Sequence, residues 1–162
     1  MMQKEKYSVL QLTLLVGARV AIGWYCLYEG VIKLITPHWT SMPYLMDSQG
    51  FLALFFRNMA TNPTLLSIVD FLNIVGLIAV GIGLILGILT RISTVSGILL
   101  IGLYALSHPS LVASTYILPS GDHTLWIDKN IVFLFLLLIL LVFPTGKIIG
   151  LDRILFKKPA KA

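Results

Sequence analysis

Residues 9–36 read VLQLTLLVGARVAIGWYCLYEGVIKLIT, and this stretch decides the fold. It is apolar enough to cross a membrane, yet it contains Arg19, Glu29 and Lys33. A helix turns by about 100° per residue, so these three side chains share one face, and Lys33 lies one turn beyond Glu29 within ion-pair reach. A charge at the centre of a bilayer costs about 2.5–3.5 kcal/mol on insertion scales. We therefore expect this face to point into a bundle that the rest of the chain supplies.

The composition is that of a membrane protein. The chain has 162 residues, of which 57% are hydrophobic and 12% are charged, whereas a soluble domain has about 25% charged residues. The single cysteine, Cys26, excludes an internal disulfide and a CxxC pair. The formal net charge of +5 comes from basic residues at the ends of the apolar stretches, which argues against a nucleic-acid partner.

Four apolar stretches predict an all-α, integral membrane four-helix bundle that forms a single domain over residues 1–162. The expected spans are about residues 9–36, 64–89, 92–108 and 128–144. Pro37 is expected to end the first span, while Asn62 and Pro63 suit the cap and first turn of the second. In the second span Gly83 and Gly87 form a GxxxG motif, which is expected to pack against another helix of this chain or of a second copy.

The basic residues predict the orientation. The tail, residues 147–162, the N-terminus and the turn at Arg91 carry most of the Lys and Arg residues, while the two longer loops carry almost none. Basic loops stay on the cytoplasmic side of a membrane. We therefore expect both termini to be cytoplasmic and the protein to lie in the inner (plasma) membrane.

The loop between the first two spans is too long to be structureless. Its residues 47–59, DSQGFLALFFRNM, predict a short amphipathic helix with Asp47 or Ser48 as its N-cap. Trp39 and Tyr44 are expected at the membrane interface. Two roles stay open for this helix, a lid lying on the membrane surface and a gate for a substrate.

Polar side chains from all four spans are expected at one depth near the outer boundary of the membrane. They are Glu29, Lys33, Asp70, Asn73, His108, Lys129 and Asn130. Convergence of residues distant in sequence favours a binding site, and the alternative is a set of helix-end ion pairs that staple the bundle. In a binding site Glu29 and Asp70 are the candidate catalytic groups, since a buried carboxyl group can relay protons.

Arg19 lies deeper than these residues. No acid lies on the inner half of any span, so its nearest acids are expected to be Glu29 and Asp70, more than two helical turns away. Two roles stay open for Arg19. Its planar fork could hold a bound oxyanion or a quinone carbonyl, or it could make structural contacts to backbone carbonyl groups.

Other chemistries find little support. None of the three histidines pairs with another at helical spacing, which disfavours a bis-histidine haem. A metal held by His38, Asp122 and His123 is a weaker alternative, and we predict no metal site. The chain contains no Gly-rich phosphate loop, flavin motif or nucleophile elbow.

Several motifs occur in a fixed order. Residues 19–33 follow the pattern R-x3-G-x5-EG-x2-K, residues 83–91 read GLILGILTR, residues 126–130 read WIDKN, and residues 143–153 read FPTGKIIGLDR. Together these motifs resemble the DoxX/DoxD family of small four-span membrane proteins. The DoxD type is similar to the membrane subunit of thiosulfate:quinone oxidoreductase.

The resemblance implies a quinone-interacting subunit in electron transfer from an outer reductant, for instance a sulfur compound. The residues expected to bind the quinone are Arg19, Lys33, Asn73, Lys129 and Asn130. The apolar side chains expected around its ring are Trp24, Phe71 and Phe133. A redox partner protein or the donor itself would supply the electrons, so whether the chain is catalytic stays open, as does self-association. The alternative is a non-enzymatic membrane partner, or an assembly protein that binds a small hydrophobic ligand.

Overall fold

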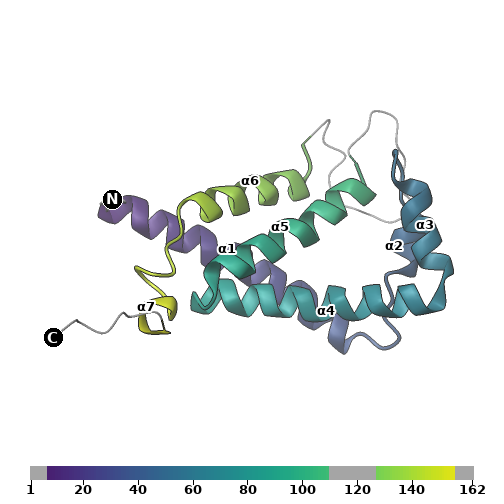
Figure 1. Ribbon diagram of the computed structural model, residues 1–162, viewed down its shortest axis with the longest axis horizontal. Helices are drawn as coiled ribbons and strands as arrows, with labels where there is room; N and C mark the ends of the chain where they lie inside the picture. Colours follow the sequence, from purple (N-terminus) through teal and green to yellow (C-terminus); the bar gives the residue numbers. More distant parts are fainter. Residues whose placement is uncertain (1–6, 110–126, 156–162) are drawn as a thin grey trace.

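The computed structural model describes residues 7–109 and 127–155, and every regular element in these two ranges is a helix (Figure 1). In chain order the helices are α1 Val9–Ile35, α2 Met42–Met46, α3 Ala53–Thr61, α4 Pro63–Leu86, α5 Thr90–Ser107, α6 Lys129–Val142 and α7 Asp152–Leu155. Helices α2 and α3 lie at one end of the long helices, called the α3 end below, and α7 lies at the other, the α7 end (Figure 1). The expected all-α fold class is thus confirmed for the part of the chain that the structure describes.

Local sequence explains where the long helices begin and end. The Ser8 hydroxyl accepts a hydrogen bond from the Gln11 N–H, and the Gln11 side chain accepts one from the Ser8 N–H, so α1 starts with a capping box. Helix α1 ends just before Pro37, because a residue that precedes proline avoids the helical conformation. Helix α4 starts with Pro63, and the Asn62 side chain caps two N–H groups of its first turn.

The connection from α1 to α4 differs from the expected single helix over residues 47–59. Asp47 is the C-cap of α2 rather than the start of a helix, and regular helix resumes only at Ala53. Gly50 lies between them with φ 85°, a left-handed conformation that glycine adopts readily. The chain therefore bends at Gly50 and forms two short helices.

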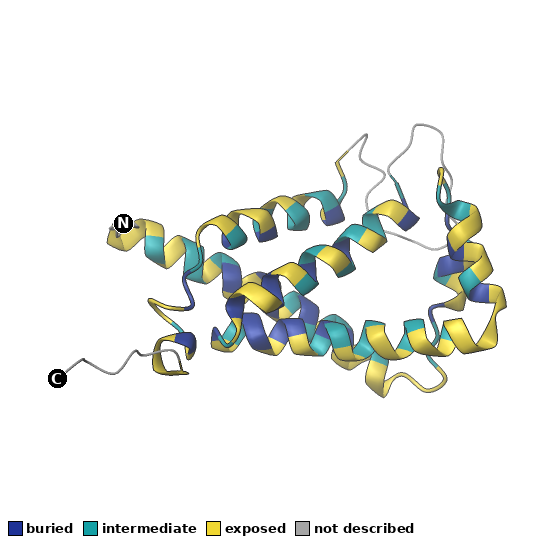
Figure 2. Cartoon of the chain, viewed as in Figure 1, coloured by how far each residue is buried: buried dark blue, intermediate teal, exposed yellow. Residues whose placement is uncertain are grey.

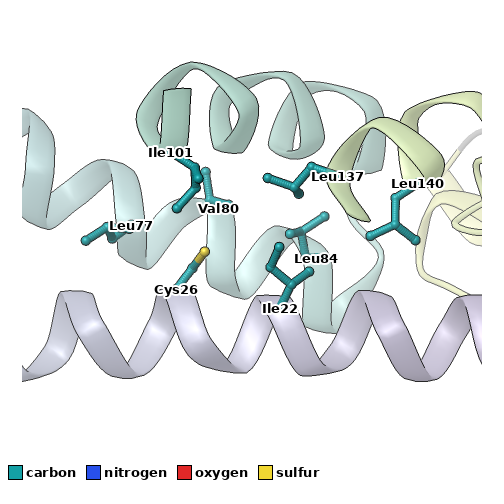
Figure 3. Close-up of a cluster of buried hydrophobic side chains, with 8 residues drawn as sticks. All are labelled: Ile22, Cys26, Leu77, Val80, Leu84, Ile101, Leu137 and Leu140. Atoms are coloured by element: carbon teal, nitrogen blue, oxygen red, sulfur yellow. The ribbon is translucent and has the colours of Figure 1, made fainter. Parts of the chain in front are cut away.

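The four longest helices share one apolar core (Figure 3). Its side chains come from α1, α4, α5 and α6, and each is at most 2% exposed. They are Ile22, Cys26, Leu77, Val80, Leu84, Ile101, Leu137 and Leu140. Cys26 is thus a packing residue, as its place within an apolar helix predicts.

Glycines set how closely α1 and α4 approach. A Cβ atom at Gly81 would lie 2.5 Å from the Leu27 backbone nitrogen, so only glycine fits there. The expected packing of the GxxxG motif against another helix of this chain is confirmed for Gly83, where an added Cβ would lie 2.9 Å from Ser93 Cβ on α5, while Gly87 forms the C-cap of α4. The close contact between α1 and α4 therefore falls on a neighbouring glycine rather than on the motif.

The long helices have many exposed positions, drawn yellow in Figure 2, and large apolar side chains occupy many of them. One large exposed side chain from each of α4, α5 and α6 and two from α1 illustrate this, with exposed fractions of 62% to 68%. They are Leu10, Trp24, Phe71, Leu99 and Phe135. Such a surface suits lipid chains, and α1, α4 and α5 are long and apolar enough to cross a membrane. Helix α6 has 14 residues, or about 21 Å of rise, which is less than a hydrocarbon core of about 30 Å.

Candidate functional site

Arg19 marks the first of two separate polar regions, and it belongs to the α7 end. Its side chain is 2% exposed, and Nη1 donates a 2.9 Å hydrogen bond to Thr145 Oγ1, in the segment between α6 and α7. Asp152 lies close enough to attract the guanidinium group. The expectation that Glu29 and Asp70 are its nearest acids is therefore wrong, because the chain after α6 folds back to the α7 end and brings an acid with it.

Asp152 fastens this returning segment. It is 5% exposed, and its carboxylate accepts hydrogen bonds from the Leu89 N–H at 2.7 Å, the Thr90 N–H at 3.0 Å and the Thr90 hydroxyl at 2.6 Å. Burial raises the pKa of Asp152, but these hydrogen bonds and the nearby Lys147 outweigh it and lower the pKa below its ordinary value. The carboxylate thus also holds the Leu89 backbone, which has a left-handed φ of 46°.

Glycines make room for this contact. A Cβ atom at Gly146 would lie 2.7 Å from Asp152 Oδ2, and one at Gly150 would lie 2.7 Å from the Gly146 carbonyl oxygen. The Asp152 N–H also donates to the Gly87 carbonyl oxygen at 2.9 Å. The FPTG and GLD motifs quoted above therefore form one packed joint with the α4–α5 turn and with Arg19.

The second polar region lies inside the α3 end. The ammonium Nζ of Lys33 is 3.6 Å from Glu29 Oε2, which confirms the ion pair expected from their spacing. The Lys33 side chain is 16% exposed and that of Glu29 is 37% exposed. Nζ also lies 5.5 Å from the ring centroids of both Trp39 and Tyr104, within the range of cation–π attraction. Lys33 is thus held between aromatic rings beside a carboxylate.

Two buried polar atoms complete this region. Among the residues that the structure describes, neither Asn73 Oδ1 on α4 nor the Tyr104 hydroxyl on α5 has a hydrogen-bond partner of good geometry. The Tyr104 hydroxyl lies close enough to the Asn73 side chain for a hydrogen bond between the two, and the charge of Glu29 also acts on Tyr104. A buried polar atom without a partner costs about 1–3 kcal/mol. We call Glu29, Lys33, Trp39, Asn73 and Tyr104 the α3-end cluster.

Other residues expected at this level have different partners. Asp70 Oδ1 accepts hydrogen bonds from the Ser41 N–H at 2.7 Å and the Ser41 hydroxyl at 2.5 Å, so Asp70 anchors the start of α2 on α4. Asn130 is buried, but its amide donates to Asp128 Oδ2 at 3.0 Å. Lys129 is exposed at the start of α6, near enough to Lys33 for the two ammonium groups to repel each other. The structure therefore brings Glu29, Lys33 and Asn73 together, and it places Arg19, Asp70 and Asn130 in other contacts.

His108 joins α2 to the end of α5. Its ring stacks on Tyr44 with centroids 3.8 Å apart, its Nδ1 lies 3.1 Å from Ser107 Oγ, and its Nε2 lies 3.9 Å from Asp47 Oδ2. Burial lowers the pKa of His108, and the charge of Asp47 opposes this effect. The Ser48 and Ser107 hydroxyls also share a hydrogen bond. These contacts hold α2 against α5.

The expected apolar lining is corrected in part. Trp24 is 62% exposed and Phe71 is 64% exposed, so both point outward rather than into the interior. Phe133 does lie inside, where its ring centroid is 4.6 Å from that of Tyr25. In the two described ranges no group of three or more His, Cys, Asp or Glu side chains could hold a metal ion. Asp122 and His123 lie outside these ranges.

Reasoning from sequence missed the partners that complete both regions. Asp152 is a single acid among the basic residues of the tail, and it belongs to the GLD part of the motif over residues 143–153. Arg19 and this motif are both among the residues that resemble the DoxX/DoxD family. Their joint occurrence was the one signal in the sequence that the two could be in contact. Tyr104 carried a weaker signal, since it lies one turn before His108 on the same helix.

The fold and the two polar regions define an all-helical membrane protein with charged side chains kept inside a bundle of apolar helices. The DoxX family model matches residues 14–108, which is more than half of the chain, and the chain belongs to the DoxX family. The match includes Arg19 and the whole α3-end cluster, whereas Thr145 and Asp152 lie beyond it. No curated protein and no solved structure matches the chain significantly.

Proposed function

We propose that this DoxX-family protein binds a quinone at the α3-end cluster and serves as a quinone-linked subunit in electron transfer from an outer reductant, such as a sulfur compound. The observation that carries the proposal is that Asn73 Oδ1 and the Tyr104 hydroxyl, both buried near the Lys33 ammonium group, have no hydrogen-bond partner of good geometry among the described residues. Buried polar atoms in proteins nearly always have partners. A quinone carbonyl oxygen would accept a hydrogen bond from the Tyr104 hydroxyl, and a hydroxyl of the reduced quinol would donate one to Asn73 Oδ1.

The residues present fit a quinone head group. Its two carbonyl oxygens accept hydrogen bonds, and the Tyr104 hydroxyl, the Asn73 amide and the Lys33 ammonium group can all donate. When bound, a quinone supplies an acceptor for two electrons and two protons. Lys33 would orient the head group, and the ring of Phe133 and the apolar core lie on the interior side of the cluster.

Glu29 is placed to hold a proton between the site and water. Its side chain is 37% exposed, and its carboxylate contacts Lys33, which itself faces Tyr104. A carboxyl group that meets both water and the site interior suits proton transfer. Arg19 has no part in this site, because Thr145 and Asp152 hold it at the α7 end.

Quinone content of the purified protein tests the proposal. Quinone is extracted from the full chain purified out of membranes and quantified by its absorbance change on reduction. We expect Tyr104→Phe, which removes one hydrogen bond worth about 0.5–1.5 kcal/mol, to weaken binding by about two- to ten-fold. Lys33→Met should weaken it more, because hydrogen bonds to charged groups are worth about 1.5–3 kcal/mol. Tyr28→Phe is the matched control, since Tyr28 is 55% exposed on α1.

Absence of quinone, together with no binding of added quinone, would remove the basis of the proposal. So would equal quinone content in Tyr104→Phe, Lys33→Met and the wild type. Loss of quinone in the Tyr28→Phe control would show that the substitutions act through folding rather than through the site.

We propose further that α6 is a fourth crossing and that the α7 end is cytoplasmic in the inner membrane. The support is that α6 shares the core of the three longer helices and that Lys147 and Arg153 follow it. Cysteine labelling tests this, because the native Cys26 is 1% exposed and should stay unlabelled.

An impermeant maleimide added to intact cells should label Phe51→Cys at the α3 end, where Phe51 is 83% exposed. It should label Lys147→Cys at the α7 end, where Lys147 is exposed between α6 and α7, only after the membrane is opened. Three crossings between these positions place them on opposite sides. Labelling of both from outside would mean that α6 does not cross.

A second candidate function is that of a non-enzymatic assembly partner. The contact that favours it is the joint at the α7 end, where Arg19 fastens the chain to itself rather than facing a ligand. This candidate predicts a stable complex with another membrane or soluble protein that survives Tyr104→Phe and Lys33→Met unchanged. Co-purification of the variants distinguishes it from the quinone-binding function.

A further inference from the structure

The exposed charged side chains that the structure describes at the α7 end are all basic. In the residues that the structure describes, Arg91, Lys147 and Arg153 are exposed at the α7 end. Asp152 is the one described acid at that end, and it is buried and turned toward Leu89 and Thr90. The remaining described acids lie at the α3 end; they are Glu29, Asp47, Asp70 and Asp128. Within residues 7–109 and 127–155, the α7 end therefore presents exposed cations and no exposed acid.

Apolar side chains are exposed beside these cations. Ile154 is 70% exposed, Leu155 is 60% exposed and Ile149 is 48% exposed, all in or next to α7. The Tyr7 and Phe143 rings meet edge to face at the same end, with centroids 6.3 Å apart. Aromatic rings and mixed basic and apolar side chains are typical of the level where lipid head groups meet the acyl chains.

The cations sit on a segment that is held in place. The Leu151 N–H donates to the Leu86 carbonyl oxygen at 3.1 Å, and the Asp152 N–H donates to that of Gly87 at 2.9 Å. Together with the Asp152 carboxylate, these bonds attach the start of α7 to the last turn of α4. The side chains of this segment therefore keep a fixed position at the ends of the membrane helices.

We infer that the α7 end binds the head groups of anionic phospholipids in the adjoining leaflet. Arg91, Lys147 and Arg153 contact the phosphates, while Ile154 and Leu155 lie among the upper parts of the acyl chains. The apolar side chains beside the cations fit a lipid and have no use in binding a soluble anion. Each cation near an anionic membrane surface contributes about 1 kcal/mol, which is about a five-fold change in affinity.

Native mass spectrometry of the full chain in neutral detergent tests this inference. The protein is titrated with phosphatidylglycerol or with phosphatidylcholine of the same chain length, and the retained lipids are counted. We expect a preference for phosphatidylglycerol in the wild type. We expect the double variant Lys147→Gln/Arg153→Gln to bind it about 25-fold more weakly, from about five-fold per cation.

Two control variants show whether the loss of lipid binding comes from the charge at the α7 end, rather than from misfolding or from a charge elsewhere in the protein. The swap Lys147→Arg/Arg153→Lys conserves charge and should keep the preference. Lys129→Gln removes an exposed cation at the opposite end and should also keep it. If the double variant does not fold, Arg91→Gln on α5 is tested in its place, and its affinity for phosphatidylglycerol should be about five-fold weaker.

Equal binding of the two lipids by the wild type would overturn the inference, as would an unchanged preference in the double variant. Displacement of phosphatidylglycerol by inorganic phosphate at the same concentration would also overturn it, since the surface would then bind soluble anions. Quinone content should be the same in the variants of Arg91, Lys147 and Arg153, so that failure here is distinct from failure of the proposed function.

Discussion

Replacing Asp152 by alanine tests the contact that joins the C-terminal segment to the bundle. The carboxylate accepts bonds from the N–H groups of Leu89 and Thr90 and from the Thr90 hydroxyl. The hydroxyl can rotate toward another acceptor, but the two backbone groups cannot move without breaking the α4–α5 turn. Each unpaired buried group costs about 1–3 kcal/mol, so we expect Asp152→Ala to lower the free energy of unfolding by about 2–6 kcal/mol.

Unfolding titrations with SDS in mixed micelles measure this change. Arg153→Gln is the matched control, because it removes a neighbouring charge that is exposed, and it should change the free energy of unfolding by less than about 0.5 kcal/mol. Thr90→Val removes one of the three donors and keeps the shape of the side chain. Its loss of unfolding free energy should lie between those of Arg153→Gln and Asp152→Ala.

The pH dependence supplies an independent check. The pKa of Asp152 in the folded protein is below its ordinary value of 3.8, so folding favours the charged form. The stabilisation is therefore complete above about pH 3.8 and is lost as the pH falls through the lower folded pKa. The difference between the wild type and Asp152→Ala should be constant between about pH 5 and 8 and shrink only in stronger acid. A free energy of unfolding for Asp152→Ala equal to that of Arg153→Gln would refute the reasoning.

Two further predictions concern packing and acid sensitivity. Gly81→Ala should destabilise the protein by about 1–3 kcal/mol, because the new Cβ would lie 2.5 Å from the Leu27 backbone nitrogen, whereas Gly17→Ala meets nothing within 4 Å and should be tolerated in the same unfolding titration. Burial lowers the pKa of His108 in the folded protein below its ordinary value of 6.5, although the charge of Asp47 opposes this effect. The unfolded state therefore binds a proton more readily, and the free energy of unfolding should fall as the pH drops below about 6.5. A melting curve against pH should lose this dependence in His108→Gln and keep it in His38→Gln, and an unchanged dependence in His108→Gln would contradict the assignment.

Much of the fold follows from neighbours along the chain. The Asn62 cap, Pro63 in the first turn of α4 and the end of α1 before Pro37 each depend on a few adjacent residues. The ion pair of Glu29 and Lys33 depends only on helical spacing. These features could be predicted because helix geometry is the same wherever the helix lies.

Part of the candidate site was out of reach of this reasoning. Helical spacing places Arg19 on the same face as Glu29, but the two lie about 15 Å apart along the axis, and different elements meet each of them. Asp70 was expected to face the site, yet the chain between α1 and α2 supplies Ser41 as its partner. Such pairings depend on the path of a loop, which no periodicity in the sequence records.

The sequence by itself determined that this protein is a set of apolar membrane helices with a charged face on the first, since burial in lipid restricts composition residue by residue. Only the tertiary structure decided that the charged residues of this face belong to two separate polar regions. Arg19 is bound by Thr145 beside Asp152, and Lys33 lies beside Tyr104. The physical reason is that a buried charge takes its partner from whichever segment reaches it in space. For Arg19 that segment is the one that follows α6, and for Lys33 it is α5.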